Sequence, residues 1–235
     1  MERPHWFPDE LARAGEEHLD PAYVAAYDRK AGFDPAEDVA LLRRLGLDET
    51  ATLVDLGAGT GALALAAAPF CRRVVAVDVS HAMLDFGGKE AARLGVDNVD
   101  WVQAGFLTYE HRGDPADVVY SRNALHHLPD FWKALALDRM TEFLRPGGIL
   151  RLHDIVYSVG PSEVPTAVEA WLANAAERPE EGWTRAELKT HLRDEHSTFS
   201  WLLEPMLERT GFEIRDVSYR MSVYANYVCV HRARD

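Results

Sequence analysis

The chain has 235 residues, 47% of them hydrophobic, and a formal net charge of −13 at pH 7. Its length and apolar content suffice for the core of one large domain, and its acidity disfavours nucleic acid as a partner, because phosphate backbones are repelled. The two cysteines, Cys71 and Cys229, form no ligand cluster, and no apolar run approaches about 18 residues, so we expect no metal, no membrane contact and a cytoplasmic location.

The first 50 residues predict a helical N-terminal cap. Residues 8–31 and 35–46 have helical patterns. The second helix is expected to begin at Asp34-Pro35 and to end at Gly46. These helices would precede the first strand of the fold.

Residues 51–156 alternate regularly between apolar β runs and helical stretches. Ser80 can cap one of these helices, and Pro129-Asp130 opens another. Such alternation predicts an α/β fold with a parallel sheet and helices on both faces. The expected strands cover 51–56, 73–78, 98–103, 116–121 and 149–156, and the expected helices cover 60–69, 80–94 and 130–145.

Residues 157–198 interrupt this alternation. They contain a helix near 163–177 and a second helix opened by a capping box from Thr184 to Glu187. The segment follows the fifth strand, and ligands bind beyond the carboxyl ends of strands in such folds. We therefore interpret it as a lid or substrate-binding insertion.

Residues 199–235 end the chain with a different pattern. A helix over 199–210 is followed by β runs at 212–221 and 223–232, with almost no linker between them. Two consecutive strands without a crossover helix must pair antiparallel. The predicted sheet therefore has seven strands, five parallel strands and a C-terminal antiparallel hairpin.

The sequence VDLGAGTGA joins the first strand to the next helix through Gly57, Gly59 and Gly61. Glycines in such a turn let the backbone approach a ligand closely, because no Cβ intervenes. With Asp78 about 20 residues further on, the spacing also fits a dinucleotide fingerprint, which alone is weak evidence. Asp55 favours another adenosine-containing cofactor over NAD, because a pyrophosphate repels a carboxylate and a buried carboxylate needs a cationic or donor partner.

Several stretches together resemble a class I S-adenosylmethionine-dependent methyltransferase. VDLGAGTGALAL resembles the family's first motif and VVAVDVS the second, while DVVYSRNALHHLPD resembles the fourth-strand motif and LRPGGILRLHD the turn before the fifth strand. The resemblance covers roughly residues 50–156. It implies a Rossmann-like fold, S-adenosylmethionine as the cofactor, and methyl transfer as the reaction.

The resemblance also implies which residues hold the cofactor. Asp55 and the glycine turn would flank its methionine part, and Asp78 would accept hydrogen bonds from both ribose hydroxyls, as suits an acceptor-only carboxylate. Met83 is expected to pack on adenine, with filling of the core as an equally good role. The expected cofactor-binding residues are Asp55, Gly57, Ala58, Gly59, Gly61, Asp78, Val79, Met83, Gly105, Phe106 and Asn123.

One position departs from the family pattern. The family usually shows Gly-Asp-Ala after the third strand, where the aspartate accepts from the adenine amino group, but this sequence has Ala104-Gly105-Phe106. Gly105 has no side chain, so that acceptor is absent. Backbone groups of Gly105 and Phe106, with the ring of Phe106, are the remaining local contacts for adenine.

The candidate chemical groups follow the fourth and fifth strands. His126 is a candidate general base, since histidine titrates near pH 7, although a base is needed only if the nucleophile must lose a proton. Asp154 is expected either to meet the substrate or to cap the following segment. Candidate substrate contacts are Tyr27, His127, His196 and Tyr224.

We predict one domain over residues 1–235 that transfers a methyl group from S-adenosylmethionine to a small-molecule acceptor. A protein acceptor stays open. The alternatives outside this class are a protein that binds the cofactor for non-methyl chemistry and a non-catalytic binding module. An NAD enzyme is the least favoured reading.

Overall fold

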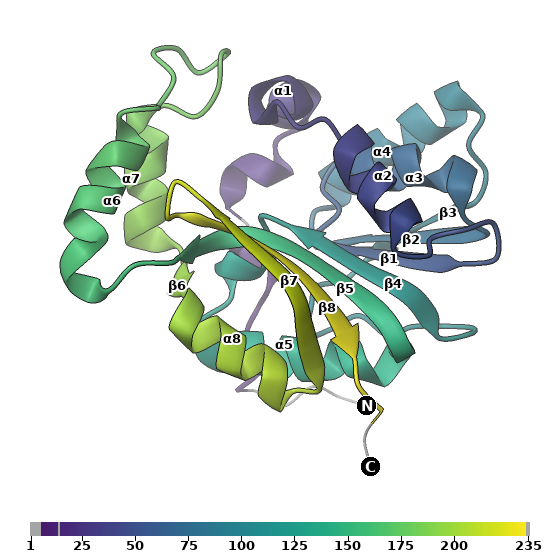
Figure 1. Ribbon diagram of the computed structural model, residues 1–235. Helices are drawn as coiled ribbons and strands as arrows, with labels where there is room; N and C mark the ends of the chain where they lie inside the picture. The colour runs from purple at the N-terminus through teal and green to yellow at the C-terminus, as the bar shows by residue number, and fades with distance from the viewer. Residues whose placement is uncertain (1–5, 14, 234–235) are drawn as a thin grey trace.

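The computed structural model describes residues 6–13 and 15–233, so positions 1–5, 14, 234 and 235 of the predicted terminal segments lie outside the described residues. Its centre is one mixed sheet of order β3-β2-β1-β4-β5-β8-β7, with a short β6 paired to β5 (Figure 1). The strands are β1 (Thr52–Leu56), β2 (Arg73–Asp78), β3 (Val99–Gln103), β4 (Ala116–Arg122), β5 (Leu144–Tyr157), β6 (Thr198–Phe199), β7 (Phe212–Arg220) and β8 (Tyr224–His231).

Strands β1 to β5 run parallel, and β8 pairs antiparallel with both β5 and β7. The predicted parallel sheet with a C-terminal antiparallel hairpin is therefore confirmed. Strand β6 is an addition to the prediction: its two residues pair with Val156 and Tyr157 where the chain leaves the insertion. A strand of this length carries no periodic signal in the sequence.

Helices cover both faces of the sheet. In Figure 1, α2, α3 and α4 lie against one face, and α5 and α8 lie against the other. None of the helices in the described part of the chain is long and apolar enough to cross a membrane. The helices are α1 (Pro21–Ala31), α2 (Ala36–Arg44), α3 (Ala62–Ala67), α4 (His81–Leu94), α5 (Asp130–Phe143), α6 (Val164–Leu172), α7 (Arg185–Asp194) and α8 (Ser200–Arg209).

The prediction of one continuous helix over 8–31 is wrong. The chain forms two short 3₁₀ turns, η1 (Leu11–Arg13) and η2 (Glu16–Leu19), before α1 begins at Pro21. Gly15 has a φ of 86°, in the left-handed region that favours glycine. Pro21 suits a first helical turn but not a helix interior, because it lacks an N–H group.

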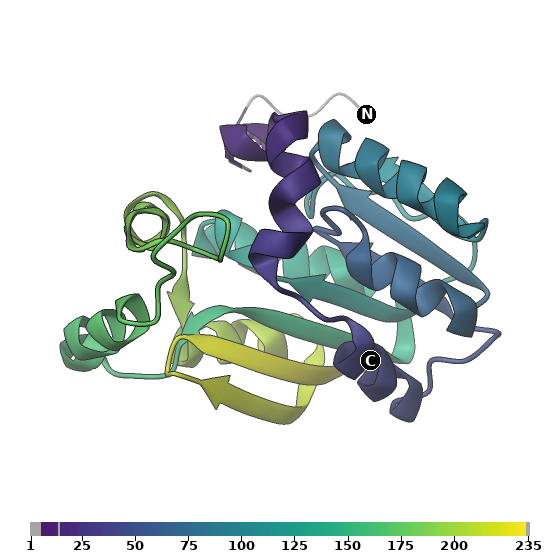
Figure 2. The same ribbon diagram turned by 90° about the horizontal axis from the view of Figure 1, so that it is seen from above.

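The insertion forms a helix pair beyond the carboxyl end of β5. Its first helix, α6, ends at Leu172, earlier than predicted, and the capping box from Thr184 to Glu187 is confirmed, with each side chain accepting from the other's N–H. Seen from above, α1 lies between this pair and α4 (Figure 2). An ion pair between Lys30 of α1 and Glu187 of α7 joins the two segments.

Candidate active site

The glycine turn after β1 passes close to β2 and to the loop after β4. The N–H groups of Gly57 and Ala58 both donate to the carbonyl oxygen of Val77, at 2.8 and 3.0 Å. Gly57 and Gly59 have φ angles of 74° and 55°. A Cβ at Gly57 would overlap the side chain of Ala124. The turn therefore requires glycine for both conformation and space.

Asp78 fixes the same turn from the end of β2. One carboxylate oxygen accepts from the N–H of Gly59 and the other from the N–H of Ser80, each at 2.8 Å. Burial raises the pKa of Asp78, and these backbone donors partly offset that effect. The carboxylate is thus an acceptor held in place at the edge of the sheet.

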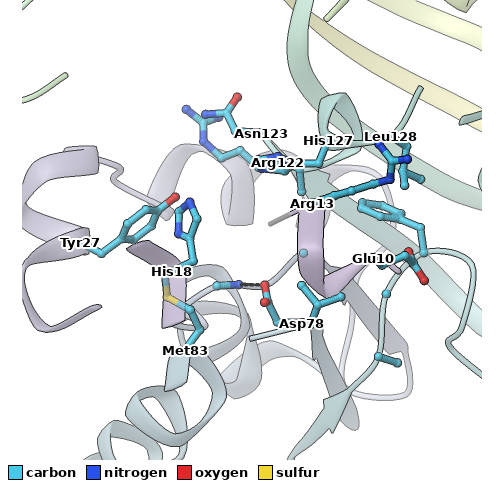
Figure 3. A pocket seen from close by; sticks show the side chains of 17 residues that line it. Glu10, Arg13, His18, Tyr27, Asp78, Met83, Arg122, Asn123, His127 and Leu128 are labelled. Atoms are coloured by element: carbon cyan, nitrogen blue, oxygen red, sulfur yellow. Dashed lines mark hydrogen bonds between the residues drawn. The ribbon is translucent and has the colours of Figure 1, made fainter. Parts of the chain in front are cut away.

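A cavity of about 100 Å³ opens beside this carboxylate. We call it the smaller cavity. Figure 3 shows Asp78 and Met83 below it, with Tyr27 and His18 on one side and Glu10 on the other. Most of the expected cofactor-binding residues line it, namely Gly57, Gly59, Asp78, Val79, Met83, Gly105, Phe106 and Asn123.

Gly61 lines neither this cavity nor the one described next. A Cβ at Gly61 would lie 2.6 Å from Cζ3 of Trp101, and a Cβ at Gly87 of α4 would overlap the same ring. Gly61 therefore lets α3 begin against Trp101, so the structure shows a packing role for this glycine, and its contact with the cofactor stays a prediction.

A larger cavity of about 500 Å³ adjoins the first. Asp55 and Ala58 from the expected cofactor set line it, as do α1, the insertion and Tyr224 of β8. Because some residues line both cavities, the two spaces meet along these residues: His18, Tyr27, Gly57, Gly59, Arg122, Asn123 and His127.

Asp55 is almost fully buried at the carboxyl end of β1. Burial raises the pKa of Asp55 to about 8, and the charges of Asp78 and Asp38 add to the effect. A cation placed against Asp55 would lower that pKa and favour the carboxylate. The position therefore fits a residue that receives a positively charged group of a ligand.

His126 lies between two carboxylates. Its Nδ1 is 2.5 Å from Oδ1 of Asp154, and its Nε2 is 3.0 Å from Oε2 of Glu195, which also pairs with His191. Burial alone would lower the pKa of His126, but the two carboxylates outweigh it and raise the pKa to about 9. The imidazolium form at neutral pH has no free lone pair on either nitrogen to accept a proton, which disfavours the expected role as a general base.

The other candidate side chains lie around this ion pair. Burial and the neighbouring charge of His126 lower the pKa of His127 to about 3, so His127 is neutral where it lines both cavities. Asp154 lines neither cavity, and its carboxylate binds Nδ1 of His126. His196 also lines neither: its Nε2 is 3.2 Å from Nη1 of Arg13.

Three of these groups have a geometry that a metal ion could use. His126, His127 and Glu195 offer ligand atoms within 4.8 Å of one another. However, a ligating imidazole must be unprotonated, and the pKa of His126 is about 9 because of its two carboxylates. The absence of a metal therefore stays a prediction.

Glu10, His18 and Glu195 belong to no motif of the sequence, although each lines a cavity. Glu10 and His18 belong to the segment before α1, and Glu195 follows α7. All three are remote in sequence from the glycine turn. For His18 the available signal is the break in the helical pattern at Gly15 and Pro21, because the segment between them does not continue a straight helix.

Comparisons with known proteins bear on the fold that carries this site. A family model described as "Methyltransferase domain" matches residues 53–148. Trans-aconitate 2-methyltransferase of Azoarcus sp. (strain BH72) is 37% identical over 116 residues, which are 48% of this chain and 42% of that protein. The similarity thus spans less than half of that relative's length.

Solved structures show the same fold at low identity. YcgJ from Bacillus subtilis gives a TM-score of 0.65 at 16% identity, covering 85% of this chain and 100% of that chain. Magnesium protoporphyrin IX methyltransferase from Synechocystis PCC 6803, with bound S-adenosylmethionine, gives 0.64 at 15% identity, covering 98% and 100%.

The sheet order, the glycine turn and the acidic end of β2 define a Rossmann-like protein with an adenosine-type cofactor site at the carboxyl edge of its sheet. Residues 53–148, the core of this chain, match the methyltransferase-domain family, and the fold is shared with S-adenosylmethionine-dependent methyltransferases of known structure. The cofactor of this family is S-adenosylmethionine.

Proposed function

We propose that this chain transfers the methyl group of S-adenosylmethionine to a small-molecule acceptor held in the larger cavity. The observation that carries the proposal is the meeting of the two cavities at shared residues, among them Tyr27, Asn123 and His127. The methyl group would lie at this junction, between cofactor and acceptor. The acceptors named for the two methyltransferases above, trans-aconitate and magnesium protoporphyrin IX, are both small molecules.

The residues present fit the cofactor on chemical grounds. Asp78 offers a fixed acceptor for the ribose diol. Asp55, whose pKa burial raises to about 8, offers a carboxyl group that a cationic ammonium would convert to its charged form. Met83 and Phe106 supply apolar surface for adenine. When bound, the cofactor supplies a methyl carbon attached to a positively charged sulfur.

The chain would contribute alignment and exclusion of water. An acceptor nucleophile in the larger cavity would approach the methyl carbon in line with the bond that breaks, so the rate depends on how both partners are positioned. Asn123 turns the chain out of β4 at the junction with a φ of 48°, uncommon for a residue other than glycine. Its N–H donates to the carbonyl of His153 at 2.8 Å, which stabilises this conformation.

The two histidines would play opposite parts toward the acceptor. His126, as imidazolium, donates and is held by Asp154 and Glu195. His127 is neutral, and its Nδ1 is buried without a hydrogen-bond partner among the described residues. We therefore assign His127 as the group that accepts a hydrogen bond from a protonated nucleophile, in place of His126.

Residues 157–198 would serve as the acceptor-binding insertion. Trp171, Trp183 and Glu195 from this segment line the larger cavity. The indole N–H of Trp171 donates to the hydroxyl of Tyr224 at 2.9 Å, which ties the insertion to β8. Aromatic walls with a few fixed polar groups are typical of small-molecule sites.

Two measurements test the proposal. Calorimetry with S-adenosylhomocysteine and with NAD should detect binding of the former alone, and transfer of radiolabel from methyl-labelled cofactor to a panel of small metabolites should identify an acceptor. Binding of NAD in place of S-adenosylhomocysteine would contradict the cofactor assignment. Cofactor binding without transfer to any acceptor would favour non-methyl chemistry or a non-catalytic binding module.

A further inference from the structure

The carboxyl group of Glu10 lies directly over Gly105 at the wall of the smaller cavity. Both residues line that cavity, and Figure 3 shows Glu10 on the side opposite Tyr27 and His18. Oε1 of Glu10 accepts from the N–H of Leu107 at 3.1 Å. A segment near the chain start therefore places a carboxylate on the loop that follows β3.

Glu10 and a side chain at position 105 would compete for one space. A Cβ built at Gly105 would lie 2.6 Å from Oε2 of Glu10 and closer still to Oε1, well inside van der Waals contact. The φ of Gly105 lies outside the left-handed region, so its backbone does not itself require glycine. A side chain at position 105 would therefore require the carboxyl group of Glu10 to move.

The surrounding loop holds this arrangement in place. The N–H of Gly105 donates to the hydroxyl of Thr108 at 2.7 Å, and its carbonyl accepts from the N–H of Tyr109 at 2.9 Å. The N–H and carbonyl groups of Gly105 are thus both hydrogen-bonded within their own loop. The acceptor chemistry at this end of the cavity comes from Glu10.

We propose that Glu10 replaces the missing aspartate of position 105 and accepts the hydrogen bond of the adenine amino group. The inference rests on the proposed use of S-adenosylmethionine. A carboxylate accepts and cannot donate, which selects an amino group over a carbonyl at that position of a purine. Asp78 and Glu10 line the same cavity, so the ribose and the purine would each have a carboxylate partner.

The test compares two ligands that differ only at this group: S-adenosylhomocysteine and S-inosylhomocysteine, in which a carbonyl replaces the amino group. The wild-type chain should bind the adenine compound at least about tenfold more tightly in calorimetry, as expected for a charged hydrogen bond. In the Glu10→Ala variant this preference should fall to below about threefold. Asp9→Asn is the matched control, because Asp9 is exposed and its carboxylate accepts from the N–H groups of Leu11 and Ala12 of its own segment.

A second variant separates loss of the acceptor from loss of structure. Gly105→Asp alone should weaken binding of S-adenosylhomocysteine, because two carboxylates would contend for one space. The double variant Glu10→Ala with Gly105→Asp should restore the preference for adenine. Circular dichroism checks that each variant is folded.

The outcomes distinguish this inference from the proposed function. A Glu10→Ala variant that keeps the wild-type preference would overturn the role of Glu10, as would a folded double variant that fails to regain it. A wild-type chain that binds neither nucleoside would instead overturn the proposed cofactor.

Discussion

The two cavities are built in different ways. The smaller cavity is formed around the ends of β1 and β2, where backbone N–H groups and Asp78 bind one another. The larger cavity is closed by segments far apart in sequence, and ion pairs such as Lys30 with Glu187 and His126 with Glu195 join them. The sheet therefore defines most of the proposed cofactor side, to which the segment before α1 adds Glu10, while the proposed acceptor side depends on contacts between α1, the insertion and the loop after β4.

The contrast is tested most strongly by removing the carboxylate of Asp78. Asp78→Ala should weaken binding of S-adenosylhomocysteine by more than about tenfold, because charged hydrogen bonds each contribute roughly 1.5–3 kcal/mol. Calorimetry gives the affinity. Asp100→Ala is the control, since Asp100 is exposed on the neighbouring β3. An unchanged affinity would remove Asp78 from the cofactor site.

A second effect should appear in the pH dependence of the affinity for the cofactor. The pKa of Asp55 is about 8, so this carboxyl is protonated at pH 7 and must lose its proton to pair with the ammonium group. Affinity for S-adenosylmethionine should therefore rise by about tenfold from pH 6.5 to pH 8, following proton release on binding. The Asp55→Asn variant should bind more weakly at pH 8 and lose this pH dependence.

The same carboxyl has a predictable effect on stability. Burial raises the pKa of Asp55 from 3.8 to about 8 in the folded state, so between these pH values the folded state keeps a proton that the unfolded state releases. The free energy of unfolding therefore falls as pH rises from about 4 through 8. The Tm of the Asp55→Asn variant should therefore exceed that of the wild type by the largest margin at pH 8. A wild type more stable than this variant at pH 8 would contradict the raised pKa.

Weakening the insertion should affect the acceptor side alone. Glu195→Gln removes one of the carboxylates that raise the pKa of His126, so the histidine should titrate at lower pH in NMR. The KM for the acceptor should rise by about three- to fivefold while the affinity for S-adenosylhomocysteine is unchanged. Glu177→Gln, an exposed position of the same insertion, is the control. A selective loss of cofactor affinity would contradict the division between the two sides.

The smallest expected effect is that of metal removal. Because His126 is paired with carboxylates on both sides, treatment with EDTA should leave methyl transfer within about 20% of the untreated rate. Activity lost on chelation and restored by a divalent cation would instead assign His126, His127 and Glu195 as ligands.

The parts of the site that could be predicted from the sequence also differ between the two cavities. The sheet, its hairpin and the placement of Asp78 follow from strand periodicity and local motifs, so they could be predicted. Glu10 and Glu195 could not, because their roles arise only when the segments before α1 and after α7 fold across the sheet edge. The charge of His126 is likewise set by partners distant in sequence, which is why its expected role as a base is disfavoured.

The packing of Trp101 between Gly61 and Gly87 has a practical consequence. Indole emission responds to the polarity and rigidity of its surroundings, and this ring touches the glycine at which the cofactor turn enters α3. The chain thus carries an intrinsic fluorophore packed against the turn whose Gly57 and Gly59 line both cavities. Subtracting the emission of a Trp101→Phe variant from that of the wild type would isolate a signal that follows ligand entry in real time, without a label.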